Sequence, residues 1–150
     1  MAQEHYYDVS VEWKNGRTGE MTSEVLENEI SVATPPQFPN GVAGIWSPEH
    51  LFVAAINSCL MTTFLAIAEN FKLPYLSFKS KAIGKLEIVD GKFMMSEIVL
   101  KPVVEVTDEE DLEKAVKVLH KAEAACLISN SVKSTIIFEP DVQLLKQIRA

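Results

Sequence analysis

Two thiols are the side chains of this sequence most able to carry out chemistry. Cys59 and Cys126 are the only cysteines among 150 residues, and they lie too far apart for a CxxC motif. A free cysteine can be a nucleophile or a metal ligand, but it is also among the residue types most often buried as a small hydrophobe. His5, His50 and His120 share no ligand spacing with the cysteines, so we expect no zinc site. The pattern alone favours inert core thiols and leaves their pairing to the fold.

Arg17 is a second candidate, because arginine is rare in this chain. The sequence contains twelve lysines but only two arginines, and Arg17 directly follows the tight-turn pair Asn15-Gly16. A guanidinium is planar and permanently charged, which suits it to orient an anion. A surface charge at the end of a strand is an equally good interpretation. Glu49 has an ordinary explanation too, since the helix dipole stabilises a carboxylate in a first helical turn.

A helix predicted over residues 47–70 positions Cys59. Ser47 can cap this helix, Pro48 suits its first position and Leu73-Pro74 ends it. No charged residue occurs from Leu51 to Ala68. A helix that is apolar nearly all round belongs in a core, and polar residues near its middle argue against a membrane span of similar length. We therefore expect a buried central helix.

The rest of the chain predicts strands on both sides of this helix and one further helix. Alternation predicts a half-buried strand at residues 5–13, and the tight-turn pair after it predicts a return strand that begins at about residue 17. Further strands are predicted at residues 21–26, 30–33, 76–89, 93–106 and 132–138. Gly84 is expected to mark a bulge, and Asp90-Gly91 a hairpin turn. A capping box of Thr107 and Glu110 predicts the start of the second helix, which carries Cys126 near its end. A short helix is expected after Pro140. The order βββ-α-ββ-α-β is typical of the α+β class.

Length and charge limit the possible partners. A chain of 150 residues fits a single domain over residues 1–150, and its net charge of -7 disfavours nucleic acid and anionic membranes. We expect no secretory signal, a cytoplasmic protein and thiols that are reduced at rest. A helix that is apolar on every side has more apolar surface than a single sheet of a 150-residue chain can easily bury. The sequence therefore also predicts a homodimer.

Three short motifs, in this order along the chain, resemble the OsmC/Ohr family of organic hydroperoxide reductases. They are Asn15-Gly16-Arg17, Ser47-Pro48-Glu49 followed by Cys59, and Ala125-Cys126-Leu127. The resemblance extends over nearly the whole chain and implies the OsmC-like fold, an intertwined homodimer with sites at the subunit interface. Family members usually carry Cys-Pro where this chain has Cys126-Leu127. The chain therefore resembles a divergent member.

This resemblance implies a role for each candidate residue. Cys59 would be the peroxidatic thiol and Cys126 the resolving thiol, while Arg17 keeps Cys59 ionised and Glu49 holds Arg17. The implied reaction reduces organic hydroperoxides to alcohols through a Cys59 sulfenic acid and a Cys59-Cys126 disulfide. An external dithiol, typically on a lipoylated protein, would restore the thiols, and no cofactor or metal is needed.

Alternatives to this peroxidase remain open. An OsmC-like protein without turnover could be a redox sensor or bind an apolar ligand, and a structural dimer with incidental thiols is a third interpretation. The apolar residues Trp46, Phe52 and Met61 favour a lipophilic peroxide as substrate.

The geometry of the predicted helix sets one constraint. On a continuous helix Glu49 and Cys59 lie ~15 Å apart along the axis, so one Arg17 cannot touch both in the same chain. Either these two residues come from different subunits around one Arg17, or the regular helix begins after Glu49. The helix dipole acts mainly in the first turn, so we expect the guanidinium to ionise Cys59.

Overall fold

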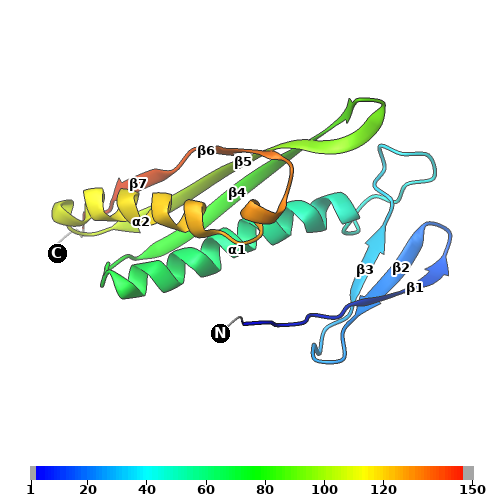
Figure 1. The fold of residues 1–150 in the computed structure, drawn as a ribbon, viewed down its shortest axis with the longest axis horizontal. Coiled ribbons are helices and arrows are strands. Elements are labelled where there is room, and N and C mark those ends of the chain that lie inside the picture. The colour runs from blue at the N-terminus through cyan, green and yellow to red at the C-terminus, as the bar shows by residue number, and fades with distance from the viewer. Residues whose placement is uncertain (1–2, 147–150) are drawn as a thin grey trace. The chain divides into compact units, whose positions relative to one another are not determined.

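The structure is a computed structural model that describes residues 3–146. The chain forms two compact units, residues 1–51 and 52–150. Residues 3–146 form two α-helices and two sheets (Figure 1), which confirms the α+β class.

The N-terminal unit holds a three-stranded antiparallel sheet in the order β1-β2-β3. Its strands are β1 (Ser10–Asn15), β2 (Thr18–Thr22) and β3 (Ile30–Ala33). Gly16 lies in the β1–β2 turn with a φ of 51°, as the predicted tight turn requires.

Two strand predictions in this unit are wrong in part. β1 begins at Ser10 and not at residue 5, because β2 ends at Thr22, the partner of Ser10, and leaves the preceding residues nothing to pair with. For the same reason the strand expected over residues 21–26 stops at Thr22. All six residues of β1 are exposed in the single chain, so the expected half-burial is not seen.

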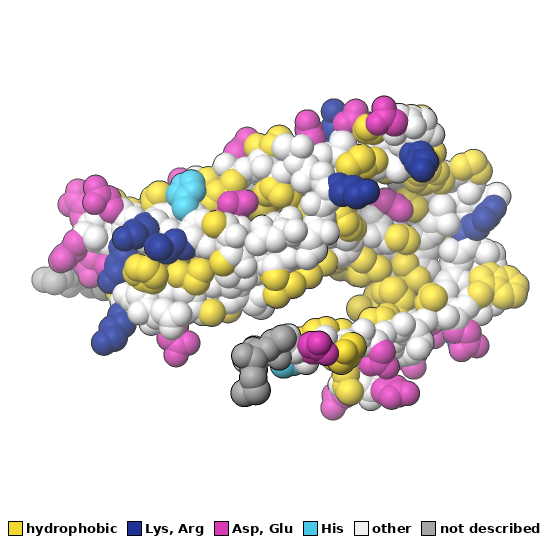
Figure 2. Space-filling view, in the orientation of Figure 1, with side chains coloured by type: hydrophobic (Ala, Val, Ile, Leu, Met, Phe, Trp, Pro, Cys, Tyr) yellow, Lys and Arg dark blue, Asp and Glu magenta, His cyan; other side chains and the backbone are white. Residues whose placement is uncertain are grey.

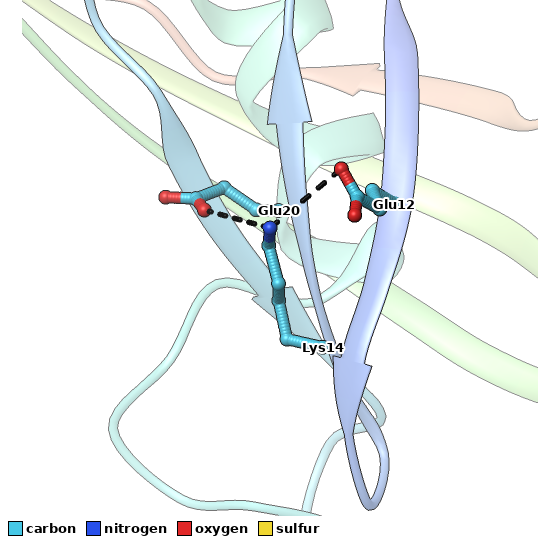
Figure 3. A network of polar contacts seen from close by, with 3 residues as sticks. All are labelled: Glu12, Lys14 and Glu20. Atoms are coloured by element: carbon cyan, nitrogen blue, oxygen red, sulfur yellow. Dashed lines mark ion pairs between the residues drawn. The ribbon is translucent and has the colours of Figure 1, made fainter.

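The charged residues of this sheet form a surface network that does not include Arg17. Lys14 Nζ lies 3.6 Å from Glu12 Oε2 and 3.9 Å from Glu20 Oε2 (Figure 3). A hydrogen bond with Glu29 and the charge of that residue raise the pKa of Glu20 above its usual value. Solvent screens ion pairs of this kind at the surface, so they contribute little to stability.

Helix α1 (Pro48–Asn70) has the predicted bounds and cap. The backbone N–H of His50 donates to Ser47 Oγ at 3.1 Å, which satisfies one N–H of the first turn. The helix is long and apolar enough to cross a membrane by length and composition, a test that the core helix of a soluble protein also passes.

Only one face of α1 is buried within this chain. The buried positions recur at helical spacing and are Ile56, Cys59, Leu60, Phe64 and Ala68. Between them Met61 and Leu65 are 39% and 38% exposed. The expectation of a helix buried all round is therefore not met in the single chain, which leaves apolar surface on α1 uncovered.

The C-terminal unit is built on a long antiparallel hairpin of β4 (Ser77–Val89) and β5 (Lys92–Val106). Asp90 and Gly91 have φ angles of 50° and 78°, as the predicted hairpin turn requires. The register shifts between Lys85 and Leu86, so the bulge lies beside Gly84 and not at it. Gly84 instead permits close packing, because a Cβ there would lie 2.5 Å from Val53 Cγ2.

Helix α2 (Leu112–Ala125) starts later than predicted. A 3-10 turn (Glu109–Asp111) precedes it, and no side chain caps either element, so the capping box of Thr107 and Glu110 is wrong. The helix ends at Cys126, whose extended backbone (φ -65°, ψ 108°) turns the chain out of α2.

After α2 the chain adds two short strands to the same edge of β5. β6 (Thr135–Phe138) pairs with residues 97–100 and β7 (Asp141–Leu144) with residues 103–106, both in parallel. The helix expected after Pro140 is therefore wrong where the chain is described. The open edge of β5 offers hydrogen bonds over residues 103–106, and these outweigh the helical spacing of the tail.

One core joins both helices to the sheet of the C-terminal unit. Alternate residues of β5, from Ile98 to Val106, are buried against α1 and α2. Phe64 of α1 stacks on Tyr75 and Phe78, with ring centroids 5.2 and 4.9 Å apart. This core fixes the helix face that carries Cys59.

Candidate active site

The fold of the C-terminal unit brings the two cysteines together. Cys59 lies on the buried face of α1, and Cys126 is the residue at which α2 ends. Cys126 Sγ lies 3.9 Å from the carbonyl oxygen of Ile56, one turn before Cys59 on α1. Each thiol also shifts the pKa of the other, so the two sulfur atoms lie close together. Residues far apart in the sequence thus form a thiol pair, which sequence spacing alone could not show.

Burial differs between the two thiols. Both are free, but Cys59 is 9% exposed whereas Cys126 is completely buried. A molecule that arrives from solvent therefore meets Cys59 first.

The surroundings of Cys59 favour its ionised form. Burial raises the pKa of the thiol, but hydrogen bonds from the Ile128 backbone, the Cys126 and Thr63 side chains and the Leu127 backbone outweigh it, so the pKa lies below its ordinary value of 9.0. Thr63 Oγ1 lies 3.8 Å from Cys59 Sγ. All of these donors belong to the C-terminal unit.

The surroundings of Cys126 favour its neutral form. Burial raises the pKa of this thiol above 9.0, the neighbouring Ser129 lowers it in part, and the neighbouring Cys59 raises it further. Two titratable groups whose environments move their pKa values apart are suited to different roles. Here Cys59 is suited to act as a nucleophile and Cys126 to remain a protonated thiol.

A half-buried polar pair holds α1 against β4 close to Cys59. Asn57 Nδ2 donates to the carbonyl oxygen of Ser80 at 2.9 Å, and Ser80 Oγ donates to Asn57 Oδ1 at 2.6 Å. Because Asn57 is two residues before Cys59, this pair limits rotation of the helix segment that carries the thiol.

Arg17 and Glu49 both belong to the N-terminal unit. Arg17 is exposed and lines an open cavity of about 550 Å³ together with Trp13, Val32 and Pro48. Among residues 3–146, no carboxylate lies within 4.0 Å of its guanidinium. Glu49 is in the first turn of α1, and its Oε2 atom is buried without a hydrogen-bond partner. A buried carboxylate oxygen without a donor is costly, so this atom is available to a cation.

The structure decides one of the two geometric alternatives for Glu49. Helix α1 begins at Pro48 and continues through Cys59, so Glu49 is part of the regular helix. The option that the helix begins after Glu49 is therefore wrong. A rise of ~1.5 Å per residue separates Glu49 from Cys59 by ~15 Å along the axis.

A second cavity, within the C-terminal unit, has both apolar and charged side chains in its lining, the charged ones being Asp90, Lys92 and Lys133. It has a volume of about 700 Å³, and its lining includes Phe52, Met94 and Met95. Of the other residues expected to favour lipophilic molecules, Trp46 is 54% exposed and Met61 39% exposed. Phe52 is thus the only one of the three that lines this cavity.

Sequence reasoning missed the donors that surround Cys59 Sγ. Thr63 follows Cys59 by one helical turn, a spacing that puts two side chains on the same face, and this signal was available from the sequence. The backbone N–H groups of Leu127 and Ile128 carry no such signal, because their direction depends on the turn after Cys126. In the described part of the chain, no group of three His, Cys, Asp or Glu residues is arranged to hold a metal ion.

Comparison with known proteins shows to which family the chain with these two thiols belongs. The model of the family described as OsmC-like protein matches residues 41–141, more than half of the chain. The chain belongs to the OsmC-like family. The match includes Glu49, Cys59 and Cys126, whereas Arg17 precedes it.

Several OsmC-like relatives match the chain nearly end to end. The uncharacterized protein YmaD of Bacillus subtilis is 24% identical over 91% of both chains. An OsmC-like protein of unknown function from Vibrio cholerae is 27% identical, with a TM-score of 0.81 over 91% of this chain and 99% of that one.

Solved structures of organic hydroperoxide resistance proteins share the fold at lower identity. One from Elizabethkingia anophelis is 20% identical, with a TM-score of 0.76 over 97% of this chain and all of that one. OhrB of Bacillus subtilis is 22% identical, with a TM-score of 0.64 over 93% of this chain and 98% of that one. At this identity the likeness establishes the OsmC-like fold of the chain.

Proposed function

We propose that this OsmC-like protein is a thiol-dependent peroxidase that reduces organic hydroperoxides to alcohols. The observation that carries the proposal is that Cys126 lies beside the turn of α1 that carries Cys59, and that the pKa values of the two thiols are moved in opposite directions. A thiolate is the form of cysteine that attacks a peroxide, so the thiol with the lowered pKa is the one suited to react first. The names of the structural relatives add support from the family.

The reaction balances with two thiols and an external dithiol. The Cys59 thiolate attacks the terminal oxygen of the peroxide, the O–O bond breaks, and a proton completes the alcohol. Cys59 then bears a sulfenic acid. The Cys126 thiol condenses with it, which forms the disulfide and releases water. An external dithiol, such as a lipoyl group on a carrier protein, reduces the disulfide by exchange and is itself oxidised.

Arg17 and Glu49 complete the proposed site in a homodimer. Because α1 is unbroken from Pro48, the Glu49 and Cys59 around one guanidinium belong to different subunits. The unpartnered Oε2 atom of Glu49 and the absence of an ion pair at Arg17 within residues 3–146 support this arrangement. Arg17 would orient the peroxide and add to the stabilisation of the thiolate.

Two further parts of the proposal are the substrate class and the compartment. A lipophilic peroxide is the proposed substrate class, because the apolar residues Phe52, Met94 and Met95 line part of a cavity in the unit that holds Cys59. A cytoplasmic location fits the cycle, because thiols stay reduced there between turnovers.

A second candidate function is redox sensing without turnover. It is favoured by the complete burial of Cys126, which hinders reduction of the disulfide from that side. Consumption of cumene hydroperoxide with dithiothreitol as reductant separates the two candidates. The peroxidase consumes many equivalents, and both Cys59→Ser and wild-type protein without dithiothreitol stop at one equivalent or fewer. Oxidation of wild-type protein that ends after one equivalent despite excess dithiothreitol would establish the sensor and contradict the peroxidase.

A further inference from the structure

Two neighbouring threonines on α1 use their hydroxyl groups differently. Thr62 Oγ1 donates to the carbonyl oxygen of Cys59 at 3.1 Å, the bond to the preceding turn that threonine commonly makes in a helix. Thr63 Oγ1 instead lies 3.8 Å from Cys59 Sγ, and within the described residues its side chain makes no other hydrogen bond. Thr63 is half-buried, so water competes only in part for this contact.

The direction of this contact depends on the charge of the sulfur. With a neutral thiol either atom can be the donor. A thiolate has no proton, so once Cys59 ionises only the Thr63 hydroxyl can donate. A hydrogen bond to a charged acceptor is stronger than one between neutral groups. The contact therefore stabilises the ionised sulfur more than the protonated one.

We propose that Thr63 is a further residue of the peroxidatic site, whose hydroxyl donates a hydrogen bond to the Cys59 thiolate. The proposal rests on the proposed function only in the role that it gives to Cys59. The contact lies within one chain and one helix, so it acts whether or not Arg17 reaches the sulfur. The hydroxyl contact is among those that lower the Cys59 pKa, which agrees with this direction.

The test measures the reactivity of Cys59 directly, in a Cys126→Ser background so that one thiol remains. Thr63→Val keeps the shape of the side chain and removes the hydroxyl, Thr63→Ser keeps the hydroxyl, and Thr62→Val is the matched control. The rate of alkylation by iodoacetamide is followed as a function of pH. Circular dichroism establishes that each variant is folded.

We expect Thr63→Val to move the alkylation profile to higher pH and to slow alkylation at neutral pH about fivefold, as for the loss of one hydrogen bond of typical strength. Thr63→Ser should restore most of the rate, and Thr62→Val should leave the profile in place. An unchanged profile in Thr63→Val would overturn the proposal. Equal shifts in both valine variants would overturn it too, because they would assign the effect to packing of the helix.

The outcome is independent of peroxidase turnover, because alkylation needs no peroxide. A protein whose profile shifts in Thr63→Val but which consumes no cumene hydroperoxide supports the Thr63 contact and contradicts the proposed function. A protein that turns over with an unchanged profile in Thr63→Val supports the function and contradicts the contact.

Discussion

Cys126 lies beside the helical turn that carries Cys59, yet the surroundings of the two thiols change their acidities in opposite directions. The Ile128 backbone, the Cys126 and Thr63 side chains and the Leu127 backbone together outweigh the effect of burial on the pKa of Cys59, while burial dominates at Cys126. The more accessible thiol is thus also the more acidic one. This pairing of access with acidity is what a peroxidatic and a resolving cysteine require.

The first prediction concerns the backbone N–H of Leu127. Leu127→Pro removes this donor, because proline has no N–H, and should therefore raise the Cys59 pKa. Leu127→Ala is the matched control, since it shortens the side chain and keeps the N–H. The measurement is the pH profile of Cys59 alkylation in a Cys126→Ser background. Identical profiles for the proline and alanine variants would show that this N–H does not stabilise the thiolate.

The second prediction concerns Arg17. If the guanidinium adds to the stabilisation of the thiolate, Arg17→Ala should raise the Cys59 pKa and slow peroxide reduction by orders of magnitude. Thermal stability should change little, because an exposed charge contributes about 0–1 kcal/mol. Arg17→Lys keeps the charge without the planar fork, so it should restore part of the pKa shift and little of the turnover. Alkylation in Arg17→Ala that follows the wild-type profile would leave the Thr63, Leu127 and Ile128 donors as the source of ionisation.

The third prediction concerns assembly. The single chain leaves large apolar side chains of β1 and α1 exposed, among them Val11 and Trp13 at 68% and 73% and Met61 at 39%. Figure 2 shows hydrophobic side chains at the surface of the molecule. Such surface is expected to be covered, so we predict a homodimer at micromolar concentration that has no folded monomer on dilution. A monodisperse folded monomer in light scattering would contradict this and would also remove the two-subunit site.

The fourth prediction concerns the pH dependence of stability. The folded pKa of Cys59 is depressed, so its contribution is present above the unfolded pKa and is lost as pH falls through the folded value. The folded pKa of Cys126 is raised, so its contribution is present below the unfolded pKa and is lost as pH rises through the folded value.

Single-cysteine variants separate these two effects. Relative to a protein without thiols, the Cys126→Ser variant should gain stability as pH rises toward about 9. The Cys59→Ser variant should lose stability as pH rises through the same range and beyond it. Thermal unfolding under reducing conditions measures both. Parallel pH curves for the two variants would contradict the opposite shifts.

Local signals in the sequence predicted the elements that position the site. The cap at Ser47 and the proline at 48 define the start of α1 within a residue, because each acts on the backbone next to it, whereas the helix already ends at Asn70, before the positive φ of Lys72 (53°). The turn at Asp90-Gly91 likewise defined the long hairpin. These signals correctly predicted that Cys59 lies in the middle of a helix and not in its first turn.

Structural features that depend on residues far away in the sequence could not be predicted from such local signals. β7 replaces the expected helix because β5 offers an open edge, and β1 is exposed on both faces although its residues alternate, since within residues 3–146 its only paired strand is β2. The donors around Cys59 come in part from the turn after Cys126, which the sequence does not place in space. The cysteine pair itself was predicted only through the family resemblance.

The measurement closest to the central claim is the fate of the two thiols after one equivalent of organic hydroperoxide. Reduced protein is treated with cumene hydroperoxide, digested without reductant and mapped by mass spectrometry, with Cys126→Ser as the control. The account predicts a disulfide between Cys59 and Cys126 of the same chain, together with one equivalent of cumyl alcohol, and a Cys59 sulfenic acid in the control. Recovery of both thiols unchanged, or of disulfides between chains only, would contradict it.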